Sequence, residues 1–205
     1  MLKSMVVFVL SLLLINSVFA LEPYVEKSLL KKIEVKYKVF AKKRFFYLQQ
    51  TLDEVKDESD LEKLKAVNNF FNDVRYTSDK KLYNKKDYWA TPWEFLGKDA
   101  GDCEDYVISK YFALKYLGID VKKLFFTYVR STKFKQPHMV LTYFKTPRSE
   151  PLILDNNNRR IFPASARKDL TPIYNFNGEI LQKGKKKKSH KKWDQLKLNM
   201  KRKKI

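Results

Sequence analysis

Gly101-Asp102-Cys103-Glu104-Asp105-Tyr106 places the only cysteine of the chain among three carboxylates, at the start of a predicted helix. Asp102 suits the N-cap position, because its side chain can accept a hydrogen bond from a free backbone N–H of the first turn. Cys103 is then the first helical residue, where the helix dipole favours a thiolate over a thiol. The sequence therefore favours a reactive cysteine, and the alternative is a free buried cysteine that is chemically inert.

The segments on either side predict helices first and strands afterwards. Apolar residues at helical spacing predict two helices upstream, at 24–56 and 61–74, and the polar and aromatic segment 77–90 is predicted to be a loop. Downstream, β-branched and aromatic residues predict strands, at 124–130, 138–144, 152–156, 161–162 and 172–176. This order predicts an α+β fold, with the helices packed on an antiparallel sheet.

His138 and Asp155 lie in two consecutive predicted strands. With a four-residue loop at 145–148, the two residues would face each other directly across a hairpin. Asp155 could then accept from one ring nitrogen of His138 and leave the other nitrogen for a thiol. A single cysteine with such a pair predicts Cys103 as nucleophile, His138 as base and Asp155 as orienting residue. The alternative for His138 is a polar residue at a strand edge.

The three carboxylates act against a reactive thiol, because neighbouring negative charge raises the pKa of a cysteine. Calcium is the natural cation for clustered carboxylates outside the cytoplasm. Helical spacing puts Asp102 and Asp105 close to one side and Glu104 elsewhere, so a single site would need further ligands from a loop. The alternative is that Asp102 caps the helix while Glu104 and Asp105 complement its dipole.

Both ends of the chain differ in composition from its middle. Residues 1–20 combine a basic start, an apolar run and Ala20 at a cleavage position, which predicts a cleaved signal peptide and export; an uncleaved anchor is the alternative. Residues 183–205 hold twelve Lys or Arg and one acid, within a net charge of +20 for the whole chain. They are predicted to form a disordered basic tail that either is simply solvated or contacts an anionic membrane, a cell-wall polymer or an acidic partner. A folded domain at 21–182 remains, and nucleic acid is not an expected partner.

The run Asp87-Tyr88-Trp89-Ala90-Thr91-Pro92-Trp93-Glu94-Phe95-Leu96, followed by the Gly101–Tyr106 motif, resembles the bacterial transglutaminase-like cysteine peptidases of the LapG type. The segments 137–141 and 152–156 resemble the His and Asp segments of that family. The resemblance implies a papain/transglutaminase-like fold, with Cys103 as nucleophile, His138 as general base and acid, and Asp155 as orienting residue. It also implies a calcium requirement, carried by Asp102 and Glu104 and less directly by Asp105.

The resemblance further implies a biological role. A LapG-type periplasmic protease cleaves the N-terminal region of a large surface adhesin, which releases the adhesin and controls biofilm attachment. An inner-membrane receptor that senses cyclic-di-GMP sequesters the protease. Two other functions stay open from the residues alone. One is a transglutaminase-like acyl transferase or cell-wall amidase on the same fold. The other is a non-enzymatic basic protein that binds an anionic envelope surface and is released by salt.

Overall fold

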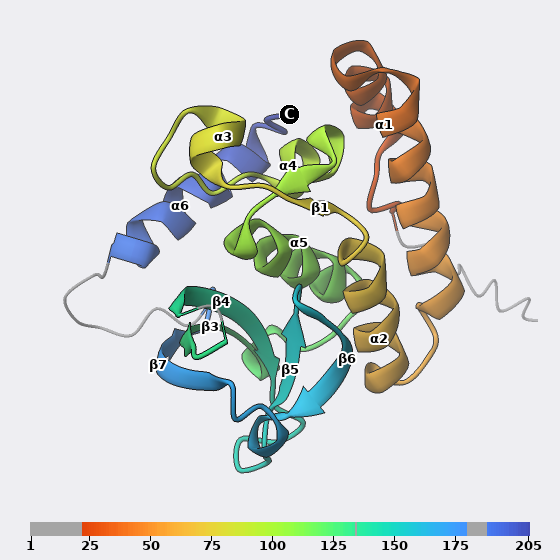
Figure 1. Cartoon of the computed structure of the whole chain (residues 1–205). Helices are drawn as coiled ribbons and strands as arrows, with labels where there is room; N and C mark the ends of the chain where they lie inside the picture. Colours follow the sequence, from red (N-terminus) through yellow and green to blue (C-terminus); the bar gives the residue numbers. More distant parts are fainter. Residues whose placement is uncertain (1–21, 134, 180–187) are drawn as a thin grey trace, which may run out of the picture.

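The computed structural model describes residues 22–133, 135–179 and 188–205 (Figure 1). The predicted signal peptide and residues 183–187 of the predicted tail lie outside this part of the chain. Within it, no helix is both long enough and apolar enough to cross a membrane.

A five-stranded antiparallel sheet forms one layer, with the strand order β6-β5-β4-β3-β7. Its strands are β3 (Leu124–Ser131), β4 (Gln136–Tyr143), β5 (Leu152–Asp155), β6 (Asn158–Pro163) and β7 (Leu170–Phe176). The five strands agree with the predicted runs, and short 3-10 turns at Val121–Lys123 and Ala164–Ala166 connect them to their neighbours. The predicted α+β fold is confirmed.

The helices form the second layer, and α5 (Cys103–Tyr116) lies in its middle against the sheet (Figure 1). Around it are α2 (Asp60–Phe71), α3 (Asp79–Tyr83) and α4 (Pro92–Lys98), with a two-residue parallel pair formed by β1 (Arg75–Tyr76) and β2 (Ala100–Gly101). Helix α4 begins with a complete capping box, in which Thr91 and Glu94 bind each other's backbone N–H. Helix α3 occupies the segment predicted to be a loop, since five residues are too few for a periodic signal.

Helix α1 (Lys27–Val55) is a helical hairpin rather than one straight helix. Its backbone leaves the helical region at Lys38, where φ is 71°. The chain turns back there, as a hydrogen bond between the two arms shows: the backbone N–H of Val25 donates to Gln49 Oε1 at 3.1 Å. In a straight helix these residues would lie more than about 30 Å apart. The two arms bury Leu29 and Ile33 on one side and Phe45, Leu48 and Leu52 on the other.

The hairpin formed by β4 and β5 has a different register from the predicted one. Tyr143 pairs with Leu152 and Leu141 with Leu154, so the connecting loop is eight residues long. His138 and Asp155 are therefore not directly opposed, and the offset between them is two residues. A shift by two leaves both side chains on the same face, because side chains alternate with period two. The predicted partnership survives in a diagonal form.

The predicted disordered tail instead contains α6 (Lys188–Lys201), which returns to the body of the protein (Figure 1). Trp193 anchors it: the side chain is fully buried against Tyr111 and Phe126, and its Nε1–H donates to the Gly178 carbonyl at 2.6 Å. A Cβ at Gly178 would come within 2.5 Å of the indole, so only glycine fits beneath it. The prediction of a disordered tail was wrong here, because it rested on the number of lysines and gave no weight to Trp193, whose burial anchors the helix.

Candidate active site

The start of α5 is fixed by Asp105, which is fully buried. One carboxylate oxygen accepts from the backbone N–H of Ala90 at 2.9 Å, and the other accepts from that of Asp102 at 3.3 Å. Gly101 is required beside it, since a Cβ there would meet the Asp105 carboxylate at 2.5 Å. Asp105 thus holds the segment before α4 against the helix that carries Cys103. This contact joins the 87–96 run to the Gly101–Tyr106 motif in the fold.

His138 and Asp155 form a direct hydrogen bond, with 2.8 Å between Nε2 and Oδ1, and both are almost completely buried. The backbone N–H of Asn157 donates to the same carboxylate oxygen at 2.9 Å. Burial raises the pKa of Asp155, but the hydrogen bond and charge of His138 and the guanidinium of Arg167 hold that pKa well below its usual range. An ionised Asp155 can only accept, so the hydrogen lies on Nε2 and leaves Nδ1 of His138 as an acceptor.

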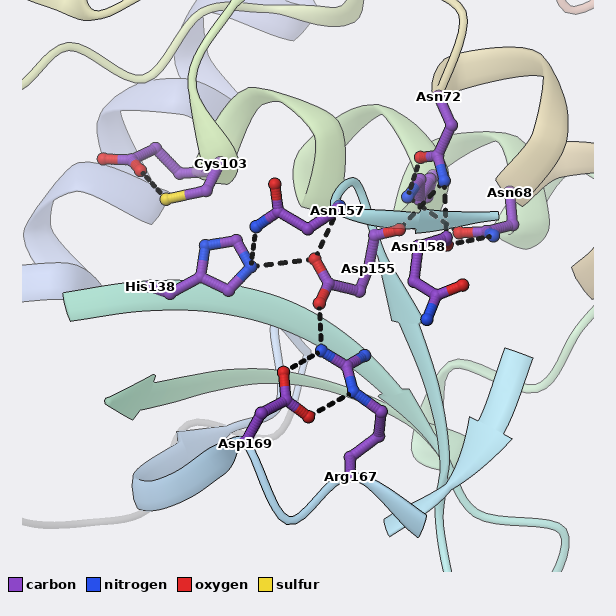
Figure 2. Close-up of polar contacts among 11 residues, drawn as sticks. Asn68, Asn72, Cys103, His138, Asp155, Asn157, Asn158, Arg167 and Asp169 are labelled. Atoms are coloured by element: carbon purple, nitrogen blue, oxygen red, sulfur yellow. Dashed lines mark hydrogen bonds and ion pairs between the residues drawn. The ribbon is translucent and has the colours of Figure 1, made fainter. Parts of the chain in front are cut away.

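Arg167 is a site residue that the sequence did not reveal. Its Nη2 donates to Asp155 Oδ2 at 2.7 Å and to Asp169 Oδ2 at 2.9 Å, while its Nε donates to Asp169 Oδ1 at 2.8 Å (Figure 2). The guanidinium therefore holds the carboxylate of Asp155 from the side opposite to His138. A lone arginine twelve residues downstream carries no motif, so only the fold identifies it.

Cys103 and His138 line one pocket of about 710 Å³, together with Tyr76, Tyr128, Gln136 and Met139. Figure 2 shows the imidazole between Cys103 and Asp155. The thiol of Cys103 donates to Glu104 Oε2 at 2.9 Å. Burial, followed by the charges of Glu104 and Asp102, raises the pKa of this thiol well above its usual value. Without a compensating cation, the surroundings of Cys103 therefore favour the neutral thiol.

An acidic cluster stands beside the thiol and consists of Asp79, Asp102 and Glu104, whose oxygens lie within 4.8 Å of one another. Asp79 supplies the further ligand, and it is the first residue of α3 rather than a loop residue. Asp105 accepts from backbone N–H groups and lies outside the cluster. One carboxylate oxygen of Asp79 and one of Asp102 are buried without a hydrogen-bond partner in the described structure. Burial and then the charges of Glu104, Asp105 and Asp79 raise the pKa of Asp102 to about 10. Unpartnered, crowded carboxylate oxygens fit a calcium ion.

Comparison with known proteins identifies the family. Residues 42–197 match the family described as bacterial transglutaminase-like cysteine proteinase, BTLCP. The chain belongs to this family. The matched range includes Cys103, His138 and Asp155 as well as most of α6, so the helix in the predicted tail is part of the proteinase domain.

Solved structures agree with this assignment. LapG of Legionella pneumophila is 41% identical over 85% of this chain and 97% of that one, with a TM-score of 0.71. Its calcium-bound form is 39% identical over 83% of this chain and 98% of that one, also with a TM-score of 0.71. No curated protein matches the chain. The resemblance seen in the sequence is confirmed, and this chain is a LapG-like transglutaminase-like cysteine protease.

In this proteinase a buried polar network connects the helix of Cys103 to the turn after Asp155 (Figure 2). Lys110, fully buried on α5, donates to Asn68 Oδ1 at 2.8 Å and to Asn72 Oδ1 at 2.7 Å. The amide of Asn72 in turn donates to the Asp155 carbonyl at 2.9 Å, and that of Asn68 to the Arg159 carbonyl at 3.0 Å. The two halves of the site are thus joined through α2.

Lys110→Met is expected to lower the free energy of unfolding by about 2–4 kcal/mol, because it leaves the buried amide oxygen of Asn68 and the half-buried one of Asn72 without this donor. Urea denaturation followed by circular dichroism measures this. Lys115→Met on the same helix is the matched control, since its ion pair with Glu179 is exposed and should contribute less than about 1 kcal/mol. Equal stability of Lys110→Met and the unmodified protein would mean that the desolvation cost of the amine fully offsets its hydrogen bonds.

Proposed function

We propose that this proteinase is a calcium-dependent cysteine endopeptidase in which Cys103, His138 and Asp155 form the catalytic triad. One observation carries the proposal: the only thiol of the chain shares a pocket with a histidine whose Nε2 is held by an ionised carboxylate at 2.8 Å. That pairing leaves Nδ1 of His138 as the base for the thiol.

The reaction follows from these positions. Nδ1 of His138 takes the proton of the Cys103 thiol, and the sulfur attacks the carbonyl carbon of the scissile peptide bond. Backbone N–H groups in the first turn of α5 stabilise the oxyanion. The C–N bond breaks as His138 returns the proton to the leaving amine. Water, deprotonated by the same ring, then hydrolyses the thioester, which releases the acid and restores the thiol.

The proposed calcium ligands are Asp79, Asp102 and Glu104, of which Asp79 replaces the Asp105 of the sequence analysis. Calcium bound there offsets the negative charge beside the thiol and so favours the thiolate. Two observations support this site: Asp79 and Asp102 each have a carboxylate oxygen without a hydrogen-bond partner, and the carboxylate of Glu104 accepts from the Cys103 thiol. The calcium-bound form of the Legionella protein adds support from a relative.

Calcium is expected to raise the melting temperature, and the effect should grow between pH 5 and pH 9. The raised pKa of Asp102 means that the folded metal-free protein holds a proton there which the unfolded chain loses near pH 4. Stability of the metal-free protein therefore falls as pH rises through this window. Melting curves with calcium and with a chelator measure both trends.

Asp102→Asn is the matched variant, because asparagine keeps the N-cap and removes the charge. It should be at least as stable as the unmodified protein in chelator and should lose the calcium shift. A calcium shift that survives in Asp102→Asn would place the metal elsewhere.

For the biological role, we propose a periplasmic enzyme that cuts the N-terminal region of a large surface adhesin, releasing it and limiting biofilm attachment. An inner-membrane receptor for cyclic-di-GMP is the proposed regulatory partner and would sequester the protease. The support is the likeness to LapG and the predicted signal peptide.

Cleavage of the host's adhesin N-terminal region by residues 21–205 tests this function. We expect one discrete cut with calcium, none with a chelator, and none after alkylation of the enzyme with iodoacetamide, which reacts fastest with thiols and finds only that of Cys103 in this chain. Cleavage that persists in chelator would exclude the calcium requirement and leave the cysteine protease assignment in place. Isopeptide products would instead indicate a transglutaminase, and release of cell-wall fragments an amidase. Surface binding that survives alkylation, with no reaction, would indicate the non-enzymatic basic protein.

A further inference from the structure

The turn of the α1 hairpin carries an unusual set of exposed apolar side chains. Nine large apolar residues are exposed among the described residues, and five of them belong to α1: Val35, Val39, Phe40, Phe46 and Tyr47. Val35 and Phe40 flank the turn at Lys38 and are 70% and 71% exposed. Single exposed apolar residues are ordinary, but a group at one protruding end indicates a contact surface.

The same hairpin is strongly basic. Residues 27–47 contain eight lysines and arginines and one glutamate, and Lys36, Lys38 and Lys43 are exposed around the turn. The Nζ of Lys43 lies 5.9 Å from the ring centre of Phe40, so a cation stands beside an exposed aromatic ring at this turn. Figure 1 shows the turn at one extreme of the molecule, pointing away from the sheet.

Exposed apolar side chains together with lysines limit which binding partners fit the turn. A second copy of the chain would bring two basic hairpins together and is opposed by charge. A stable protein interface buries about 800 Å² on each partner, which needs a broad face rather than a protruding turn. An anionic bilayer needs only a few apolar side chains at the headgroup level, with lysines reaching the phosphates.

We propose that the turn of α1 binds the surface of an anionic lipid bilayer, with Val35, Val39 and Phe40 entering the headgroup region. The lining of the Cys103 pocket comes from other segments, with no residue of α1. Membrane contact through this turn would therefore leave the pocket open to a substrate. The inference is independent of the proposed catalytic function.

Fluorescence quenching by brominated lipid tests the insertion. The three native tryptophans, Trp89, Trp93 and Trp193, are 4%, 6% and 0% exposed, so lipid should quench only an introduced indole. We expect Phe40→Trp to be quenched at least about twofold more than Ile173→Trp, the control on β7, because only the former enters the bilayer. Equal quenching at both positions, or none at Phe40→Trp, would overturn the proposal.

Sedimentation with phosphatidylglycerol-containing vesicles tests the charge. Each lysine near an anionic surface contributes about 1 kcal/mol, so Lys36→Glu with Lys43→Glu should weaken binding by about tenfold or more. Lys145→Glu with Arg148→Glu makes the same charge change on an exposed loop of the sheet and should change binding less than about twofold. Equal losses in the two pairs would mean that total charge, and not the turn, governs binding. No binding to vesicles, with capture of an acidic protein instead, would reassign the turn to a protein partner. Cleavage of a soluble peptide should be the same in all variants and serves as the folding control.

Discussion

Cys103→Ala is expected to lower kcat/KM by at least about 10⁴-fold, because it removes the nucleophile on which both half-reactions depend. The side chain is half-buried and small, so the melting temperature should move by less than about 3 °C. Peptide cleavage followed by chromatography and a melting curve on the same sample measure the two effects.

Cys103→Ser is the companion variant, since the hydroxyl keeps the shape and the hydrogen bond to Glu104 but ionises far less readily than a thiol. It should be as inactive as the alanine variant. Activity above about 1% in Cys103→Ala would exclude Cys103 as nucleophile, because triad removal in cysteine and serine enzymes leaves far less. The chain offers no second thiol, so another residue type would then carry the reaction.

The sequence predicted the elements that depend on local pattern. The helix of Cys103 begins at the predicted residue, because Asp102 is a strong local signal for an N-cap. Strands β3 to β5 were predicted to within about two residues. Helix α1 could not be predicted fully from its pattern. The apolar periodicity continues through Lys38 and predicts one helix, whereas the contact of Val25 with Gln49 shows that the chain turns back.

The site divides in the same way. Cys103, His138 and Asp155 could be predicted because their residue types are rare in this chain or are placed at strand ends. The exact pairing of His138 with Asp155 could not, because an eight-residue loop is indistinguishable from a four-residue one in the sequence. Asp79, Arg167 and Lys110 were missed for a common reason. Each acts through a tertiary contact with a residue of the site, and charged residues are too frequent in this chain to stand out.

Asp155→Asn is expected to lower kcat by about 10³-fold, because an amide cannot replace both acceptor oxygens of the carboxylate. If its oxygen faces His138, its NH₂ faces the guanidinium of Arg167, and if it is reversed, His138 loses its acceptor and its tautomer. Arg167 is 7% exposed and keeps only Asp169 as counter-ion, so unfolding should become easier by about 2–4 kcal/mol. Steady-state cleavage and urea denaturation measure the two effects.

Asp169→Asn separates catalysis from stability, because Asp169 contacts the same guanidinium but not His138. It should lose stability and keep most of the activity. Comparable activity losses in both variants would show that activity depends on the arginine network and not on the acceptor for His138.

The dependence of stability on acid pH also tests the role of the Asp155 charge. The pKa of Asp155 is lowered in the folded protein, so its contribution is present above about pH 4, the unfolded value, and is lost as pH falls through the folded pKa. The stability difference between Asp155→Asn and the unmodified protein should therefore be constant at neutral pH and shrink below about pH 4, since protonation then removes the same charge from both.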